Sequence, residues 1–202
     1  MSDEEIHDHL ITFLIAGHET TAMALTFTWL LLTTNPEERN RLEREVTTVL
    51  DGPPTATDLS KLSVTEQVAK ESMRLYPPAA MLFREATEET RLGGYRIPEG
   101  TKLLLPQFTV HSDERWFEAP NQFRPERFAD DQSDQRPEFA YFPFGGGPHQ
   151  CIGMHFAMME LKHIIPVLAR NVDFELVSAA DPEINMELTL QPADDVRMVI
   201  HK

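Results

Sequence analysis

The sequence predicts a mainly α-helical chain with small antiparallel sheets, and three observations carry this prediction. An apolar stretch runs from residue 10 to residue 34, capping and breaker signals divide the segments after it, and glycine and proline punctuate residues 82–105. The 202 residues suffice for one ordinary domain, and a composition with 41% hydrophobic and 25% charged residues is typical of a globular protein.

Four segments carry helix signals. Helices are expected at residues 2–34, 36–50, 64–75 and 151–170. Ser2 with Glu5, and Ser63 with Glu66, have the spacing of a capping box, in which two side chains near a helix start satisfy free backbone N–H groups. Asn35 is expected to cap the second helix, because it precedes a proline suited to the first helical position.

The other segments lack helical periodicity. Residues 82–105 are expected to form a small antiparallel sheet, since short segments alternate with Gly93-Gly94 and other turn residues. Residues 112–150 are expected to be an irregular meander, which is unusual inside a compact domain and is often functional. Residues 172–202 are expected to form two or three short strands.

The composition is acidic. Asp and Glu total 33 against 18 Lys and Arg, which gives a formal net charge of −15. This balance argues against nucleic-acid binding and against docking on anionic membranes. A single cysteine excludes an internal disulfide and fits a reducing compartment, so we expect a cytoplasmic protein.

The N-terminal stretch is expected to be neither a signal peptide nor a membrane span. Residues 1–9 are acidic, whereas a signal peptide begins with a basic segment. His18 and Glu19 interrupt the apolar stretch, and the clean run after them is too short to cross a bilayer. A buried core helix is therefore the favoured interpretation.

The segment 144–153, with the sequence FGGGPHQCIG, is the strongest candidate site. It places the only cysteine, Cys151, after three glycines and a proline, at the expected start of a helix. Glycines allow a bulky group to approach the backbone, and N–H groups at a helix start stabilise a thiolate. Cys151 is therefore a natural metal ligand. The alternative is an ordinary glycine-rich loop with a small buried cysteine.

This segment resembles the haem-ligand loop of the cytochromes P450, whose pattern is F-x-x-G-x-[RH]-x-C-x-G. Phe144, Gly147, His149, Cys151 and Gly153 fill the pattern. The resemblance implies that Cys151 is the axial ligand of the iron in haem b, through its thiolate. It further implies that Phe144, Gly153 and the neighbouring Gly145 contact the cofactor.

Residues 16–21, with the sequence AGHETT, resemble the oxygen-activation segment of the same family, [AG]-G-x-[DE]-T-[TS]. The Thr20 hydroxyl lies four residues after Ala16 and can bond to its carbonyl, which locally opens the helix. The resemblance implies that Ala16 and Gly17 leave room for dioxygen above the haem. It also implies that Thr20 and Glu19 are catalytic residues that deliver protons. The alternative is a kinked core helix in which Glu19 pairs with a neighbour.

Two further elements of the family are present. Glu71 and Arg74 match its E-x-x-R motif, and Arg127 lies in a match to its P-E-R-[FW] element. The three side chains are expected to form a structural ion-pair triad that supports the haem loop. His111 and Trp116 resemble residues of the proximal region and are expected to serve in packing.

Haem carries two propionates, so the resemblance implies cations near them. Arg84 matches a strand arginine that commonly holds a propionate, and His149 is the second candidate. The alternative for Arg84 is an ordinary strand charge that pairs with Glu85 or Glu88.

The resemblance implies a haem-thiolate monooxygenase that inserts one atom of O2 into a small apolar organic substrate. Its electrons would come from a ferredoxin or a flavoprotein reductase. The substrate would face residues 14–21, 79–83 and 188–193. The motif at residue 16 normally lies near the middle of a family member, so the chain resembles the carboxy-terminal half only. It is therefore expected to be a partial haem-binding domain.

Two alternatives stay open. The chain could be a catalytically silent fragment that needs an amino-terminal half. A remote alternative is a zinc-binding module in which His149, Cys151 and His155 share one ion, with His7 or His9 as a further ligand.

Overall fold

The computed structural model of the chain describes residues 1–129 and 136–201. Residues 130–135 of the expected meander and residue 202 of the expected strand region lie outside this description. The α-helices are α1 (Asp3–Thr34), α2 (Pro36–Val49), α3 (Ser63–Leu75), α4 (Gln107–Val110) and α6 (Met154–Asn171). Short 3-10 turns are η1 (Leu59–Lys61), η2 (Pro125–Phe128), η3 (Glu138–Ala140) and η4 (Gly147–His149). The strands are β1 (Leu82–Glu85), β2 (Thr90–Leu92), β3 (Tyr95–Ile97), β4 (Lys102–Leu105), β5 (Asp173–Leu176), β6 (Ile184–Met186), β7 (Leu190–Pro192) and β8 (Met198–His201).

Helix α1 begins with the capping box that the sequence predicts. The Ser2 hydroxyl accepts a hydrogen bond from the Glu5 N–H (3.2 Å), and the Glu5 carboxylate accepts one from the Ser2 N–H (2.7 Å). Acidic residues fill the first turn, where they complement the positive end of the helix dipole. The start of this long helix is therefore fixed by its own local sequence.

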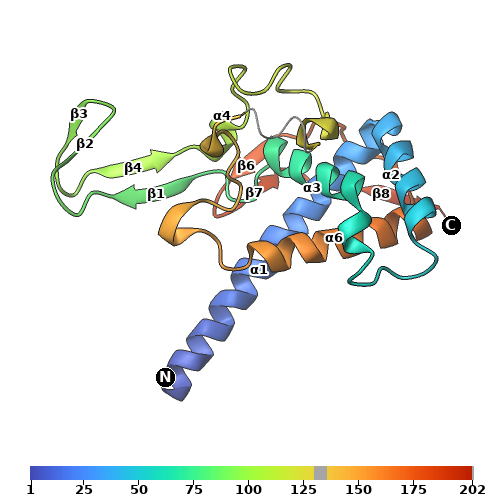
Figure 1. Cartoon of the computed structure of the whole chain (residues 1–202), viewed down its shortest axis with the longest axis horizontal. Coiled ribbons are helices and arrows are strands. Elements are labelled where there is room, and N and C mark those ends of the chain that lie inside the picture. The colour runs from blue at the N-terminus through green and yellow to red at the C-terminus, as the bar shows by residue number, and fades with distance from the viewer. Residues whose placement is uncertain (130–135, 202) are drawn as a thin grey trace.

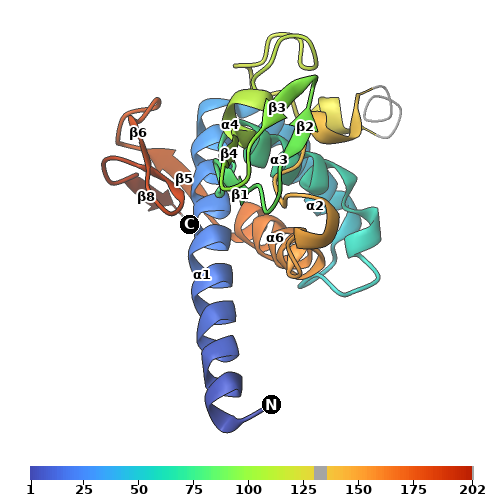
Figure 2. The same cartoon turned by 90° about the vertical axis from the view of Figure 1, so that its left-hand side faces the viewer.

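Only the second half of α1 is a core helix. Its buried residues begin at Thr21, whereas residues 3–18 are exposed and extend beyond the rest of the molecule (Figures 1 and 2). The prediction of a buried helix is thus wrong for the first half, because nothing in the described chain packs against it. By length and composition alone, α1 also qualifies as a membrane-crossing helix, a test that soluble core helices and signal sequences pass too.

Two predicted caps differ from the structure. The Asn35 amide donates to the Leu31 carbonyl (2.8 Å), so this side chain caps the end of α1 and makes no cap bond to α2. Helix α3 starts at Ser63 itself, without a side-chain bond from its N-cap residue. The Glu45 carboxylate of α2 accepts hydrogen bonds from the N–H groups of Val64 (2.6 Å) and Thr65 (2.8 Å) instead. A distant carboxylate therefore replaces the expected local capping box.

The main core lies where the second half of α1 packs against α2, α3 and α6 (Figure 1). Its buried apolar residues are Ala24, Trp29, Leu31, Leu32, Leu42, Val46, Leu50, Leu62, Val68, Ala69, Met73, Phe123, Leu161 and Ile165. The hydrophobic effect of burying this cluster orients the four helices relative to one another.

Four two-stranded antiparallel sheets occur in the described residues, pairing β1 with β4, β2 with β3, β5 with β8 and β6 with β7. The first two form one extended finger (Figure 1). Gly93 and Gly94 both have positive φ angles, which the tight turn between β2 and β3 requires. The C-terminal region holds four strands, whereas two or three were expected.

Helix α6 begins three residues later than expected. Gly153 is its N-cap residue, so Cys151 lies in the preceding loop and not in the first helical turn. The helix continues through Pro166 to Asn171. The loop that carries the cysteine therefore leads directly into a helix that packs in the main core.

We expect Glu45→Ala to lower the free energy of unfolding by about 1–2 kcal/mol, because two N–H groups at the start of α3 lose their acceptor. Ser63→Ala removes only one weaker contact to Glu45 and is the matched comparison. Urea unfolding followed by circular dichroism measures both. A larger loss of stability for Ser63→Ala than for Glu45→Ala would show that the local capping box, and not Glu45, stabilises the start of α3.

Candidate functional site

The cysteine loop is closed by its own backbone. The Cys151 N–H donates to the Phe144 carbonyl (2.9 Å), and Gly145 and Gly147 have φ angles of +70° and +67°. Side chains other than glycine are strained at such angles. The Cys151 thiol is free and exposed. The loop thus presents an unpaired sulfur on a backbone of fixed shape.

Two glycines of the loop also allow close contacts. A β-carbon added at Gly146 would lie 2.4 Å from the Phe139 ring, and one added at Gly145 would lie 3.3 Å from the Leu82 side chain. At the first distance the Phe139 ring, which is 53% exposed, would have to move aside. The second distance shows that the loop lies close to strand β1, which begins at Leu82.

Hydrogen bonds with helix α4 and with its C-cap residue, His111, hold Phe142, which lies just before the cysteine loop. The Phe142 N–H donates to Nε2 of His111 (2.9 Å), and the Gln107 amide donates to the Phe142 carbonyl. Both backbone polar groups of Phe142 are therefore bonded to buried side chains. The His111 ring also packs against the rings of Tyr141 and Phe142. His111 thus positions the loop, a more specific role than the expected packing.

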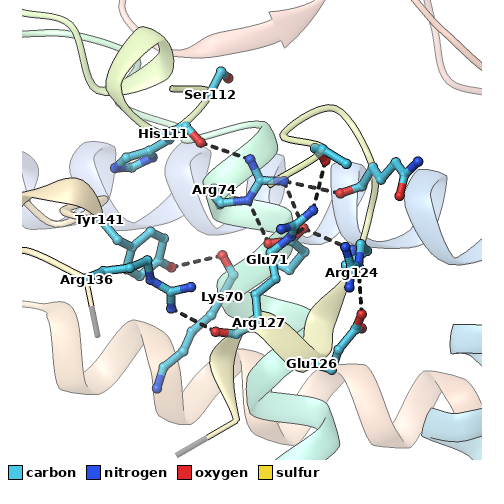
Figure 3. A network of polar contacts seen from close by, with 12 residues as sticks. Lys70, Glu71, Arg74, His111, Ser112, Arg124, Glu126, Arg127, Arg136 and Tyr141 are labelled. Atoms are coloured by element: carbon cyan, nitrogen blue, oxygen red, sulfur yellow. Dashed lines mark hydrogen bonds and ion pairs between the residues drawn. The ribbon is translucent and has the colours of Figure 1, made fainter. Parts of the chain in front are cut away.

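The expected triad is present as a buried network (Figure 3). The Arg74 guanidinium donates to both oxygens of the Glu71 carboxylate (2.7 and 2.8 Å), and Arg127 donates to one of them (3.3 Å). Glu71 and Arg74 are completely buried. The Arg124 N–H adds a fourth hydrogen bond to this carboxylate (2.9 Å).

Backbone carbonyls in the meander, and that of His111 just before it, accept hydrogen bonds from other donors of the two guanidinium groups. Arg74 donates to the carbonyls of His111 (2.9 Å) and Gln122 (3.3 Å), and Arg127 donates to that of Ala119 (2.8 Å). Ala119 has a φ of +45°, an angle that is uncommon outside glycine. The network therefore holds an irregular backbone whose described part contains only short 3-10 turns.

The polar groups of the predicted oxygen-activation segment lie at the middle of α1. The Thr20 hydroxyl donates to the Ala16 carbonyl (2.6 Å), the back-bond that their spacing predicts. A β-carbon at Gly17 would meet no atom within 4 Å, so the space beside it is open. The Glu19 carboxylate accepts hydrogen bonds from Thr189 (2.6 Å) and Gln191 (2.8 Å) of the β6–β7 hairpin.

The two expected propionate ligands are available on the surface. Arg84 lies on β1, and its guanidinium donates to the Phe83 carbonyl (2.8 Å) but pairs with no carboxylate among the described residues. The expected alternative pairs with Glu85 or Glu88 therefore do not form. His149 lies in turn η4, exposed and two residues before Cys151.

The remote zinc hypothesis fails. In the described ranges, no three His, Cys, Asp or Glu side chains gather in a way that could hold a metal ion. His149, Cys151 and His155 therefore do not form the ligand group of this remote alternative.

The donor set fits a haem. A single exposed thiol suits thiolate ligation of iron, and the large apolar side chains of Ile152 and Phe156, one and five residues after it in the sequence, are 86% and 65% exposed. Exposed apolar side chains of this size are typical of a surface that a bound group covers.

Comparison with known proteins agrees with the geometry. A family profile described as Cytochrome P450 matches residues 1–198. The chain belongs to the cytochrome P450 family. It is 37% identical over 197 residues to the putative cytochrome P450 132 of Mycobacterium tuberculosis, a match that covers 97% of this chain and 42% of that protein.

Other P450 relatives show the same partial coverage. Cytochrome P450 4d2 of Drosophila melanogaster is 38% identical over 203 residues, covering 98% of this chain and 40% of the relative. The cyclooctatin synthase of Streptomyces melanosporofaciens is 41% identical over 170 residues, covering 84% of this chain and 37% of the relative. The chain thus spans about two fifths of the length of these P450 relatives.

Several residues of the site escaped the sequence analysis. Gln107, Thr189 and Gln191 are common polar residues in segments with no motif, and their partners lie 35 to 172 residues away. Gly146 lies in the glycine run that the sequence analysis singled out, but Phe139, whose ring lies beside it, is in the irregular segment. Only tertiary structure brings these groups together.

We expect Glu71→Gln to destabilise the P450 chain by about 3–5 kcal/mol, because Arg74 and Arg127 would stay buried without a counter-charge. Glu126→Gln is the matched control, since Glu126 pairs with Arg124 at a partly exposed position and its loss costs about 1 kcal/mol or less. Urea unfolding at pH 7 measures both. Equal effects would show that the buried network does not stabilise the meander.

The pH dependence of stability should depend on His111. Burial, and next the positive charge of Arg74, lower the pKa of His111 from 6.5 to about 3. Between these values the unfolded chain binds a proton that the folded chain does not, so stability falls as the pH drops below about 6.5, by up to about 1.4 kcal/mol per pH unit.

We therefore expect His111→Gln to make the free energy of unfolding less dependent on pH between 6.5 and 4, although its value at pH 7 also falls. The same change at exposed His155 controls for the loss of a histidine. Urea titrations at several pH values give the slope. An unchanged slope in His111→Gln would contradict the buried neutral imidazole.

Proposed function

We propose that this chain is the haem-ligating and oxygen-activating part of a haem-thiolate monooxygenase. The reaction is RH + O2 + 2 e⁻ + 2 H⁺ → ROH + H2O, where RH is a small apolar organic substrate. The observation that carries the proposal is the free, exposed Cys151 thiol at the end of a backbone-closed glycine loop. Membership of the P450 family supports the same reaction class.

Haem b is the proposed cofactor, and it supplies the redox chemistry that activates O2. The single cysteine supports haem b, because covalent attachment of a c-type haem uses two further cysteines. Cys151 would be the iron ligand, on a loop shaped by Phe144, Gly145 and Gly153. Arg84 would hold a propionate, since its guanidinium has no carboxylate partner in the described chain.

His149 is proposed as the second propionate ligand, since its exposed imidazole follows Gly147 and can donate from a ring nitrogen. Ala16 and Gly17 would form part of the wall above the cofactor. The open space beside Gly17 supports this placement. Thr20 and Glu19 would be the catalytic residues, with Thr20 donating a hydrogen bond toward the reacting oxygen and Glu19 holding the proton to be delivered.

The substrate, electron donor and location are also proposals. Exposed apolar side chains of α1 and the hairpin tip, among them Leu14 and Leu188, support an apolar substrate. Two electrons would come singly from a ferredoxin or a flavoprotein reductase. The unpaired cysteine supports a reducing compartment, the cytoplasm.

A second candidate is a chain that is silent until an amino-terminal polypeptide completes the pocket. The exposed first half of α1 favours it, because Leu10, Phe13, Leu14 and Ile15 are 55–65% exposed. Apolar side chains in such a run are normally covered. The chain also spans only about two fifths of its relatives. The two candidates share the same cysteine and differ in whether haem alone is enough.

We expect the chain, mixed with hemin, reduced and exposed to carbon monoxide, to give the spectrum of a thiolate-ligated haem. Cys151→Ser should abolish this spectrum, while Gln150→Ala, a neighbouring exposed change, should keep it. Absorption spectroscopy measures all three. A thiolate-type spectrum that persists in Cys151→Ser would end the proposal. A spectrum that appears only with an added amino-terminal P450 segment would favour the second candidate.

A further inference from the structure

The Glu19 carboxylate is bound asymmetrically. Its Oε1 accepts a hydrogen bond from the Thr189 hydroxyl (2.6 Å) and another from the Gln191 amide (2.8 Å). In the described part of the chain, Oε2 accepts none. The two donors come from the β6–β7 hairpin, which lies beside α1 (Figures 1 and 2). They are 170 and 172 residues away from Glu19 in the sequence.

The three side chains form a closed set with a fixed direction. The Gln191 amide also donates to the Thr189 hydroxyl (3.0 Å), so its two hydrogens are used on Glu19 and Thr189. The single hydroxyl hydrogen of Thr189 is directed to Glu19. Oε1 therefore has both of its acceptor sites filled, and the second Gln191 hydrogen is used on the Thr189 hydroxyl oxygen.

The hairpin that supplies these donors is firmly anchored. Thr189 is 5% exposed, and Leu190 is completely buried. The Leu190 N–H donates to the Pro78 carbonyl (2.9 Å), and its side chain packs in a cluster with Phe27 and Ala80. The donors are thus held by core packing and a backbone hydrogen bond. They can position a charged group that lies on another element.

We propose that Thr189 and Gln191 are positioning residues that hold Oε1 of Glu19, so that Oε2 alone binds and releases the proton. This inference rests on the proposed role of Glu19 in proton delivery. The hairpin side chains themselves do not carry the proton onward, because the Thr189 hydroxyl hydrogen and one Gln191 hydrogen already point at Oε1 and the other Gln191 hydrogen points at Thr189. They restrict the carboxylate to one orientation, and the proton route leaves Glu19 on the side away from the hairpin.

Infrared spectroscopy of the chain labelled with ¹³C-glutamate tests the contact without haem. The Glu19 carboxylate band is identified by its loss in Glu19→Gln. We expect Thr189→Val and Gln191→Leu to shift this band, because an ionised oxygen loses a donor. Thr189→Ser keeps the hydroxyl and should leave the band in place.

Asn185→Leu is the matched control on the same hairpin. Asn185 is the direct cross-strand partner of Gln191, but its amide donates to Glu187 and not to Glu19. The Glu19 band should therefore not move in this variant. A band that stays unchanged in both Thr189→Val and Gln191→Leu, with circular dichroism showing folded protein, would overturn the inference.

The haem-loaded protein provides the functional test. We expect Thr189→Val to release more hydrogen peroxide per electron pair, to lower product formation roughly tenfold and to change its pH profile, since a misplaced acid delivers protons less efficiently. The carbon monoxide spectrum depends on Cys151 and should not change. If the infrared band shifts but the peroxide released per electron pair and the pH profile of product formation stay unchanged, both residues have only a structural role. That result would overturn the inference. Loss of the spectrum in the unmodified chain would overturn the proposed function, and the infrared comparison would still decide the contact.

Discussion

One buried carboxylate holds the irregular part of this molecule together. Glu71 accepts hydrogen bonds from two guanidinium groups and one backbone N–H, at a position without solvent access. Burying such charges is costly unless every donor and acceptor is satisfied. The other guanidinium N–H groups donate to backbone carbonyls. These are the carbonyls of Ala119 and Gln122 in the meander and of His111 just before it. The meander therefore reaches low energy only in the one shape that places these carbonyls correctly.

This constraint extends to the cysteine. His111 uses its carbonyl to accept from Arg74 and its imidazole to accept from the Phe142 N–H. The Phe142 carbonyl in turn accepts from the Gly145 N–H (2.9 Å), at the start of the loop that ends at Cys151. A short series of hydrogen bonds thus links the buried ion pair to the backbone of the cysteine loop.

The sequence predicted the contacts that depend on local spacing. Glu71 with Arg74 and Thr20 with Ala16 lie three and four residues apart on helices, where side chains meet by geometry alone. The cap of α3 was wrong because Glu45 reaches it from another helix, a contact that no local pattern encodes. The prediction of burial was also wrong for the first half of α1. An apolar run predicts burial but does not show whether another element of the chain packs against it.

Two regions of the chain differ in how far they are stabilised by contacts within it. The cysteine loop, its supporting network and the second half of α1 are stabilised by contacts inside the described residues. The apolar side chains beside the predicted oxygen-activation segment, by contrast, have no packing partners there. Glu19 is the exception on that side, because the β6–β7 hairpin holds it from within the chain. The orientation of Glu19 is therefore set by contacts within this chain, whereas the apolar side chains of the first half of α1 have no partner on another element of the described residues.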